Sequence, residues 1–476
     1  MAILGRSVKR LIALLLCIPS VWAAGGLELL PPPTSLVLND SQLTRLQQQV
    51  DRSVASGQYR EALDSARQLA QALAADPVSG VSALENLGLI EIQAGELDTG
   101  IGSLEAVLEK LRGSGSFRDP RLAKPLYALG IAYYQLQDYL KAIDYIEQAN
   151  FVTRTDKGLE SLEQTRHDDL LLDSLIRVGR LEEAMDRLEV STNIQRQAIG
   201  GGPELEQALY RAARWYSLLE ASYHESRLHE ERLEILAQVV GAESPELVPV
   251  YYDLANSYSR RLHDDLERLR DMKAAERNVS YSFVRTDQVR RAIAYDQGAR
   301  SDDRMLIDAE WKAVRSLKIA QRILEDQPEP DQRAIADSYV RLGDHYQLIG
   351  DERKARRYYQ RAYDLLHENG ATDYLAQTFG TPVPIYHKPL KLPATNDPTL
   401  ISAYQGEAEL LLDVNSRGQP RNIEVVELRP RQAAILEDKA LRYSRDTIFR
   451  PRLTEEGTVS TEKMRYIYQF RPAARP

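Results

Sequence analysis

The sequence predicts a mainly α-helical protein in two parts. The larger part is a long array of paired helices, and the smaller is an α+β module with the order strand, strand, helix, strand. In the larger part, apolar residues recur at the helical period and helices alternate with glycine turns. Between Gly406 and Phe470 the apolar period becomes 2, then helical, then 2 again. With 476 residues, two or three domains are expected.

The first residues have the pattern of a secretory signal. Basic residues precede the short apolar segment Leu11–Val21, and Val21-Trp22-Ala23 allows cleavage after Ala23 or Ala24. About 12 apolar residues are too few for a membrane span, which needs about 20. We therefore expect residues 1–24 to be a signal peptide that directs the chain to the periplasm, with a retained anchor as the alternative. The basic residues are Arg6, Lys9 and Arg10.

Cysteine usage and charge exclude several classes of function. Cys17 is the only cysteine and lies inside the signal, so the exported chain would have no disulfide, no cysteine-based metal site and no catalytic thiol. Leu16 precedes it, where a lipoprotein signal has a small residue, which disfavours lipidation. The net charge is −9, and most of the negative charge lies between the signal and residue 395. Because nucleic-acid binding selects a basic face, we expect no nucleic-acid partner.

One helical pattern recurs along residues 40–370. Each copy has a small residue where two helices cross, then a glycine turn, then a helix with internal alanines. The turn residues Gly57, Gly95 and Gly179 are separated by 38 and then 84 residues, and 84 is two steps of 42. The clearest copies are SGQYREALDSARQLA (56–70), ALENLGLIEIQAGELDTGIGSLEAVL (83–108), PLYALGIAYYQLQDYLKAIDYIEQA (125–149), LLLDSLIRVGRLEEAMDRL (170–188) and YVRLGDHYQLIGDERKARRYYQRAYDLL (339–366).

This pattern resembles the tetratricopeptide repeat. The resemblance is weaker in Glu204–Val240, which lacks the turn glycine, and in the charged segment Arg260–Met305, which we interpret as a solvated helix or a helical insertion. Stacked repeats of this family form a superhelix with an inner groove that holds a partner. The alternative for the tyrosines is that they fill the gaps between repeats. From the repeat register, the expected groove residues are Lys124, Tyr127, Tyr134, Tyr252, Asn256, Asp344 and Gln347.

Residues 371–398 are expected to be a linker, because TPVPIYHKPLKLPATNDP contains five prolines. The module that follows, residues 399–473, begins with an alternating strand, a turn at Asn415–Gly418 and a return strand. A helix then precedes a last alternating strand, which ends in MRYIYQF. The apolar face of the sheet is expected to comprise Ala408, Leu410, Leu412, Val414, Met464, Tyr466, Tyr468 and Phe470.

The module resembles the C-terminal domain of the TonB family. The matching residues are Gly406, Asp413, Gly418, Val425-Val426, Ala440-Leu441, Phe449-Arg450-Pro451, Gly457 and Phe470. The resemblance implies that the module binds an extended segment of an outer-membrane transporter by pairing it with the edge of the last strand. Two features depart from TonB energy transducers, because the N-terminal apolar segment is short and a helical array replaces the proline-rich span. The residues implied in strand pairing are Lys463, Arg465, Tyr466, Ile467, Tyr468 and Gln469.

No catalytic or metal-binding pattern stands out. The histidines form no H-E-x-x-H pair, and His224 and His229 are five residues apart, so they diverge on a helix. The chain has no G-x-S-x-G, no P-loop and no G-x-G-x-x-G that opens a helix after a strand. We therefore expect no enzymatic activity, no cofactor and no metal ion.

These observations predict a periplasmic adaptor that is peripheral to the envelope membranes. Its partners would be proteins or extended peptides, including outer-membrane transporters or TonB-system components. Two alternatives remain open: a membrane-anchored TonB-type energy transducer, or a structural protein whose C-terminal module only forms a homodimer through an exposed strand edge.

Overall fold

The structure is a computed structural model that describes residues 30–34, 36, 40–114, 118–277, 301–386, 406–429 and 434–469. The predicted signal, residues 1–24, lies outside the described residues. The chain divides into two compact units, the first ending at Ala198 and the second beginning at Ile199. None of the helices in the described part of the chain combines the length and the apolar character that a membrane crossing requires.

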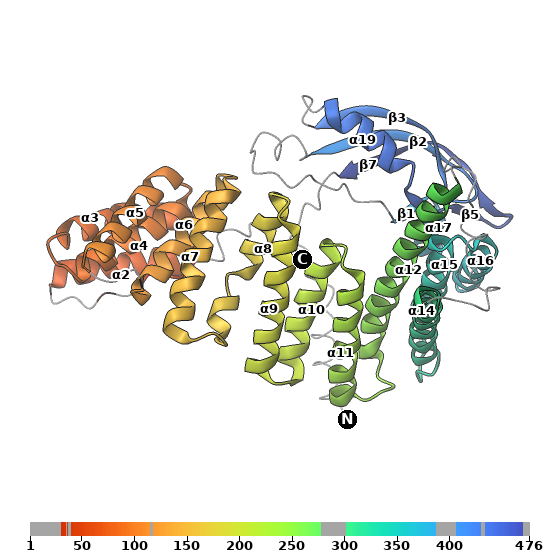
Figure 1. The fold of residues 1–476 in the computed structure, drawn as a ribbon, viewed down its shortest axis with the longest axis horizontal. Coiled ribbons are helices and arrows are strands. Elements are labelled where there is room, and N and C mark those ends of the chain that lie inside the picture. Colours follow the sequence, from red (N-terminus) through yellow and green to blue (C-terminus); the bar gives the residue numbers. More distant parts are fainter. Residues whose placement is uncertain are drawn as a thin grey trace. The chain divides into compact units, whose positions relative to one another are not determined.

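The first unit consists of helices that pack in consecutive pairs (Figure 1). Several helices begin where the sequence offers a capping side chain. Asp40 accepts hydrogen bonds from the amides of Gln42 and Leu43, and Asp138 accepts one from the amide of Lys141. The helices are α2 (Ser41–Ala55), α3 (Tyr59–Ala72), α4 (Ser79–Ala94), α5 (Leu97–Ser114), α6 (Ala123–Gln135), α7 (Tyr139–Lys157), α8 (Asp168–Arg177) and α9 (Leu181–Ile199).

The second unit continues the same local pattern and ends in the C-terminal module (Figure 1). The charged segment that follows Arg260 is helical as far as Arg277, and residues 278–300 lie outside the described part of the chain. The helices are α10 (Gly202–Leu218), α11 (Ser222–Val240), α12 (Val248–Arg277), α14 (Ser301–Glu325), α15 (Gln332–Leu348), α16 (Glu352–Glu368) and α17 (Thr372–Phe379).

Small residues lie where paired helices cross, as the repeat pattern predicts. A Cβ at Gly88 would lie 2.8 Å from Cγ of Leu104, and a Cβ at Gly130 would lie 2.6 Å from Cγ1 of Ile146. A Cβ at Gly343 would overlap the ring of Tyr359. Since real Cβ atoms do not approach other carbons so closely, only glycine permits these helix separations.

The turn between paired helices requires a left-handed backbone conformation. Gly95 has φ +87° and Gly350 has φ +78° in this turn. The turns that lack glycine use other residues, because Gln137 has φ +62° and Glu220 has φ +57°. Gln137 lies 42 residues after Gly95, where the repeat spacing predicts a turn but the sequence has no glycine. Glu220 forms the corresponding turn of the pair in Glu204–Val240, which also lacks the glycine.

Gln137→Gly should raise the free energy of unfolding by about 0.5–1 kcal/mol. A left-handed conformation costs an L-residue roughly 1–2 kcal/mol, which exceeds the extra backbone entropy of glycine in the unfolded chain, roughly 0.5–1 kcal/mol. Gln137 is exposed, so few contacts are lost. Urea unfolding followed by circular dichroism measures the change. The control is Leu136→Gly, since Leu136 is adjacent, 45% exposed and at φ −72°. Equal destabilisation by both variants would contradict the explanation.

The C-terminal module has the predicted order of strand, strand, helix and strand. Strands β2 (Glu407–Val414), β3 (Pro420–Arg429) and β7 (Thr461–Gln469) form an antiparallel sheet of order β3-β2-β7, and α19 (Ala434–Ser444) packs against it. Side chains of β2 alternate between buried and half-buried. Short strands not foreseen lie between α19 and β7, namely β4 (Ile448–Arg450), β5 (Arg452–Thr454) and β6 (Gly457–Val459). The core comprises Ala408, Leu410, Leu412, Val414, Leu436, Ala440, Phe449 and Tyr468.

The structure corrects the predicted linker at residues 371–398. Its first part forms α17, and Val383–Tyr386 forms β1, which pairs antiparallel with β4 of the module. Pro384 lies in β1 at a register irregularity, and proline is tolerated there because a short edge strand needs few backbone donors. Residues 387–405 lie outside the described part of the chain. A fragment that begins at residue 399, the predicted start of the module, would therefore lack β1, the strand that pairs with β4.

Candidate functional site

The predicted groove residues of the first unit contact other segments of their own chain. Tyr127 is buried and stacks on His167 with ring centroids 3.5 Å apart. The hydroxyl of Tyr134 bonds to Asp173. Nζ of Lys124 donates to Oγ1 of Thr34 at 2.9 Å. For Tyr127, the structure favours the alternative that it fills a gap between repeats.

In the second unit, two predicted groove residues bind the C-terminal module. Arg450 donates from Nε to Oδ1 of Asp344 at 2.9 Å and from Nη2 to Oδ2 at 2.7 Å. Nε2 of Gln347 donates to the backbone oxygens of Arg417 at 2.6 Å and of Phe449 at 3.2 Å. Asp344 and Gln347 were expected to face a foreign partner, but this chain's own module covers them. The repeat register could not reveal this contact because the two sides are about a hundred residues apart.

The ion pair between Arg450 and Asp344 is largely buried, with side-chain exposures of 13% and 24%. Burial by itself would lower the pKa of Arg450, but the Asp344 carboxylate outweighs it and raises that pKa above its ordinary value. Asp344 also accepts a hydrogen bond at 2.8 Å from the hydroxyl of the buried Tyr359 on α16. Helices α15 and α16 and strand β4 are therefore joined by one polar cluster.

The last strand offers one edge to a partner. β7 pairs with β2 through one edge, and no other strand in the described part of the chain pairs with its second edge. Lys463, Arg465, Ile467 and Gln469 are exposed, as the alternation predicts. Tyr468 is fully buried and Tyr466 is half-buried in the module core. These two tyrosines were expected among the partner-binding residues, but their side chains belong to the covered face of the sheet.

A cavity of about 260 Å³ lies among helices α10, α11 and α12 of the second unit. Asn256, predicted for the groove, is exposed and lines it. Tyr252, predicted beside it, is half-buried and packs under the guanidinium of Arg341, 4.1 Å from its ring centroid. The complete lining is Tyr210, Arg214, Ser217, Leu218, Glu225, His229, Asp253, Asn256 and Arg260.

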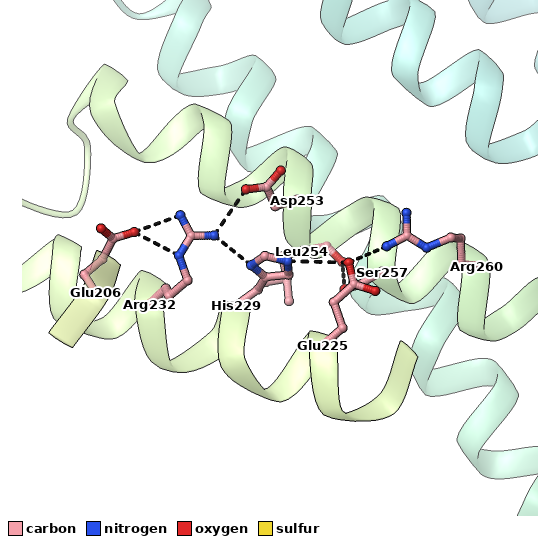
Figure 2. A network of polar contacts seen from close by, with 8 residues as sticks. All are labelled: Glu206, Glu225, His229, Arg232, Asp253, Leu254, Ser257 and Arg260. Carbon is pink, nitrogen blue, oxygen red and sulfur yellow. Dashed lines mark hydrogen bonds and ion pairs between the residues drawn. The ribbon is translucent and has the colours of Figure 1, made fainter. Parts of the chain in front are cut away.

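Four of the lining residues, Glu225, His229, Asp253 and Arg260, belong to a network of polar contacts (Figure 2). Arg232, which is buried, donates to Oε1 of Glu206 at 2.8 Å and to Oδ2 of Asp253 at 3.2 Å. It also donates from Nη1 to Nδ1 of His229 at 2.8 Å. Because arginine has no acceptor, His229 must carry its proton on Nε2 when it is neutral. That nitrogen lies 3.7 Å from Oε1 of Glu225.

Glu225 is the most buried carboxylate in the cavity, at 4% exposed. Its Oε1 accepts a hydrogen bond from Nη2 of Arg260, whereas its Oε2 is buried and has no hydrogen-bond partner. Burial alone would raise the pKa of Glu225, but His229 and Arg260 together outweigh burial and lower that pKa below its ordinary value. The group is therefore a carboxylate near neutral pH, and its Oε2 is a buried oxygen without a hydrogen-bond partner.

Sequence reasoning did not find this network. Glu225, His229 and Arg232 are spaced by four and three residues on α11, which places them on one helix face. That spacing is also common in solvated helices, so it carries no signal on its own. The partners Glu206, Asp253 and Arg260 come from other helices. In the described part of the chain, no group of three or more His, Cys, Asp and Glu residues is arranged to hold a metal ion.

The family model of the tetratricopeptide repeat matches residues 123–150 and 336–365. These two segments are tetratricopeptide repeats. The first match spans α6 and most of α7, and the second spans most of α15 and of α16. Neither range includes the C-terminal module, so its resemblance to the TonB family stays a prediction. No curated protein matches the chain.

Several solved structures are similar to this chain. The apo form of RapI is 13% identical, covering 71% of this chain and 82% of that one, with a TM-score of 0.38. A tetratricopeptide repeat protein from Parabacteroides merdae is 12% identical over 71% and 99%, with a TM-score of 0.33. A Rap protein complexed with Competence and Sporulation Factor is 14% identical over 72% and 89%, with a TM-score of 0.30.

Proposed function

We propose that this protein is a non-enzymatic adaptor of the cell envelope with two protein-binding surfaces. The tetratricopeptide repeats support a protein-interaction scaffold, since stacked helical pairs provide extended binding surfaces. The repeats hold one partner, and the cavity among α10, α11 and α12 is part of that surface. The C-terminal module binds a second partner by adding a strand to β7.

The observation that carries the second surface is the edge of β7. A strand that is paired on one side only presents backbone donors and acceptors that match another extended chain. The side chains that flank this edge are accessible, and Ile467 is 53% exposed. Lys463 and Arg465 give the edge a basic character, although Arg465 also contacts Glu409 of β2. An extended segment with acidic or neutral side chains would suit this edge.

The proposal places the protein in the periplasm, peripheral to the membranes and without a cofactor. The signal-like pattern in residues 1–24 supports export. The TonB-like motifs, from Gly406 to Phe470, support a transporter segment or a TonB-system component as the partner of β7. Docking of the module on α15 through Arg450 supports an adaptor, since it couples the strand-binding surface to the repeats.

A photo-crosslinking residue at position 467 should capture a partner protein in intact cells. The control is the same residue at position 426, because Val426 is also 53% exposed but lies on β3, at the opposite edge of the sheet. The expected result is a crosslinked partner from position 467 that is absent from position 426. Crosslinks only between two copies of this chain would instead support a homodimer. Equal capture from both positions would contradict strand addition at β7.

A further inference from the structure

Helices α14 and α16 expose a set of cationic side chains that no carboxylate of the described residues neutralises. The two helices are the second members of consecutive pairs, α12 with α14 and α15 with α16. Each of these cations is exposed, and none has an ion pair in the described part of the chain. This arginine surface comprises Arg315, Lys318 and Arg322 on α14, and Arg353, Arg356, Arg357 and Arg361 on α16.

The positive charge of this surface is local, since the whole chain has a net charge of −9. The segments Arg315–Arg322 and Arg353–Arg361 contain no acidic residue. Glu352 directly precedes the second segment, but its carboxylate pairs with Arg417 of the C-terminal module at 3.5 Å. The arginine surface is therefore complementary to an anionic ligand.

The arrangement of these charges opposes the stability of α16. Arg353, Arg357 and Arg361 are four residues apart, and like charges at this spacing destabilise a helix. Arg353 also lies in the first turn, where the helix dipole disfavours a cation. Rules of local stability are commonly broken at functional sites, so the cost points to a binding role for these side chains.

The cations of the two helices belong to one surface. Tyr358 of α16 packs against the buried cluster that includes Leu317 of α14. The guanidinium carbon of Arg357 lies 5.4 Å from the ring centroid of Tyr358, and Lys318 follows Leu317 directly in the sequence. A ligand that lies along this contact can therefore reach cations of both helices.

The side chains favour the carboxylates of a protein over a membrane. Six of the seven cations are arginines, whose planar guanidinium binds a carboxylate through two hydrogen bonds. A membrane-binding surface also needs apolar side chains that insert among the lipids. Trp311 is the only large apolar side chain exposed on the described parts of α14 and α16, and Arg315 lies 4.8 Å from its ring centroid.

The spacing of the arginines limits the conformation of the ligand. Residues four apart on a helix are separated by about 6 Å along its axis. Alternate residues of an extended chain lie on one face and are separated by about 6.6 Å. A helical ligand would need an apolar contact face, whereas in α16 no large apolar side chain is exposed. An extended ligand with acidic residues at alternate positions therefore matches Arg353, Arg357 and Arg361.

We propose that the arginine surface binds an extended, acidic segment of a partner protein, in which aspartate or glutamate recurs at every second position. Three carboxylates of the segment pair with Arg353, Arg357 and Arg361, and the cations of α14 contact further acidic groups beside them. The inference rests on the proposed function, in that it names the chemistry of a protein segment that the repeats would hold.

Three fluorescent peptides built on threonine would test this. The first has three glutamates at alternate positions, the second has the same three glutamates in one block, and the third has glutamine at the alternate positions. Fluorescence anisotropy of each peptide, titrated with the full chain, measures the affinities. The alternating peptide should bind about threefold more tightly than the block peptide and about tenfold more tightly than the glutamine peptide.

The variant Arg353→Gln/Arg357→Gln/Arg361→Gln should weaken binding of the alternating peptide by about tenfold, since each exposed ion pair contributes roughly a factor of two. It should also remove the advantage of the alternating peptide over the block peptide. The three side chains are exposed and have no ion pair in the described part of the chain, so the variant should fold. Thermal unfolding checks this.

The matched control is Arg45→Gln/Arg52→Gln/Arg211→Gln. It removes the same charge from exposed arginines of α2 and α10 that also have no ion pair in the described part of the chain. The control should leave the three affinities unchanged. Equal weakening by both triple variants would reveal a general effect of net charge and overturn the inference.

Other outcomes would also overturn the inference. Equal affinities for the alternating and block peptides, or tighter binding of an alanine-rich helical peptide with glutamate at every fourth position, would exclude the extended segment. Binding of phosphatidylglycerol vesicles or of a single-stranded oligonucleotide, lost in Arg353→Gln/Arg357→Gln/Arg361→Gln and without binding of any peptide, would identify a different ligand. None of these outcomes changes the capture from position 467, so the proposed function is tested separately.

Discussion

Gly343→Ala should lower the free energy of unfolding of the second unit by about 3 kcal/mol, at the upper end of typical overpacking costs. The added Cβ would overlap the ring of Tyr359, which is 1% exposed on the paired helix α16. The ring cannot turn away freely, because its hydroxyl donates to Asp344 at 2.8 Å. Relief of the overlap must therefore separate α15 from α16 or break this hydrogen bond.

Urea unfolding monitored by tryptophan fluorescence measures the change, because Trp215 and Trp311 both lie in the second unit. The control is Gly102→Ala on α5, where a Cβ would meet nothing within 4 Å. That variant should stabilise the first unit by about 1 kcal/mol, the usual advantage of alanine over glycine in a helix, and circular dichroism measures it. A loss below about 1 kcal/mol for Gly343→Ala would show that the crossing is more loosely packed than the structure indicates.

Asp344→Ala should destabilise the docking of the C-terminal module by about 3–5 kcal/mol, the range found when one member of a buried ion pair is removed. The change leaves the guanidinium of Arg450, only 13% exposed, without its carboxylate. It also removes the acceptor of the Tyr359 hydroxyl. We expect the module to separate from α15, and limited proteolysis should then cleave it faster than in the wild-type chain.

The double variant Asp344→Leu/Arg450→Met is the matched control. Replacement of both members of a buried ion pair by apolar residues is often neutral, so this variant should keep most of the stability that Asp344→Ala loses. Urea unfolding and the rate of proteolysis should agree on this order. If Asp344→Ala leaves both measurements unchanged, the ion pair does not hold the module on α15. The pairing of β1 with β4 and the hydrogen bonds of Gln347 would then be enough to hold it.

The parts of the fold that depend on neighbours in sequence were predictable. Glycine at 88, 130 and 343 indicated close helix crossings, and the structure has Leu104, Ile146 and Tyr359 in the space that a Cβ would need. Turns without glycine were harder to predict from the sequence, because Gln137 and Glu220 adopt a left-handed conformation that their residue types seldom adopt. The five prolines suggested a linker, but pairing with β4 makes Val383–Tyr386 a strand.

The sequence by itself determined the helical pairs, their turn positions and the alternating strands of the module, because periodicity and backbone sterics act over a few residues. Only the tertiary structure decided which polar side chains meet. Asp344 binds Arg450 across 106 residues, and Glu225 meets Arg260 across 35. These contacts depend on how elements pack, and a change of one residue in repeat register rotates a side chain by about 100° on a helix. For that reason the positions expected to hold a partner include two that hold this chain's own C-terminal module.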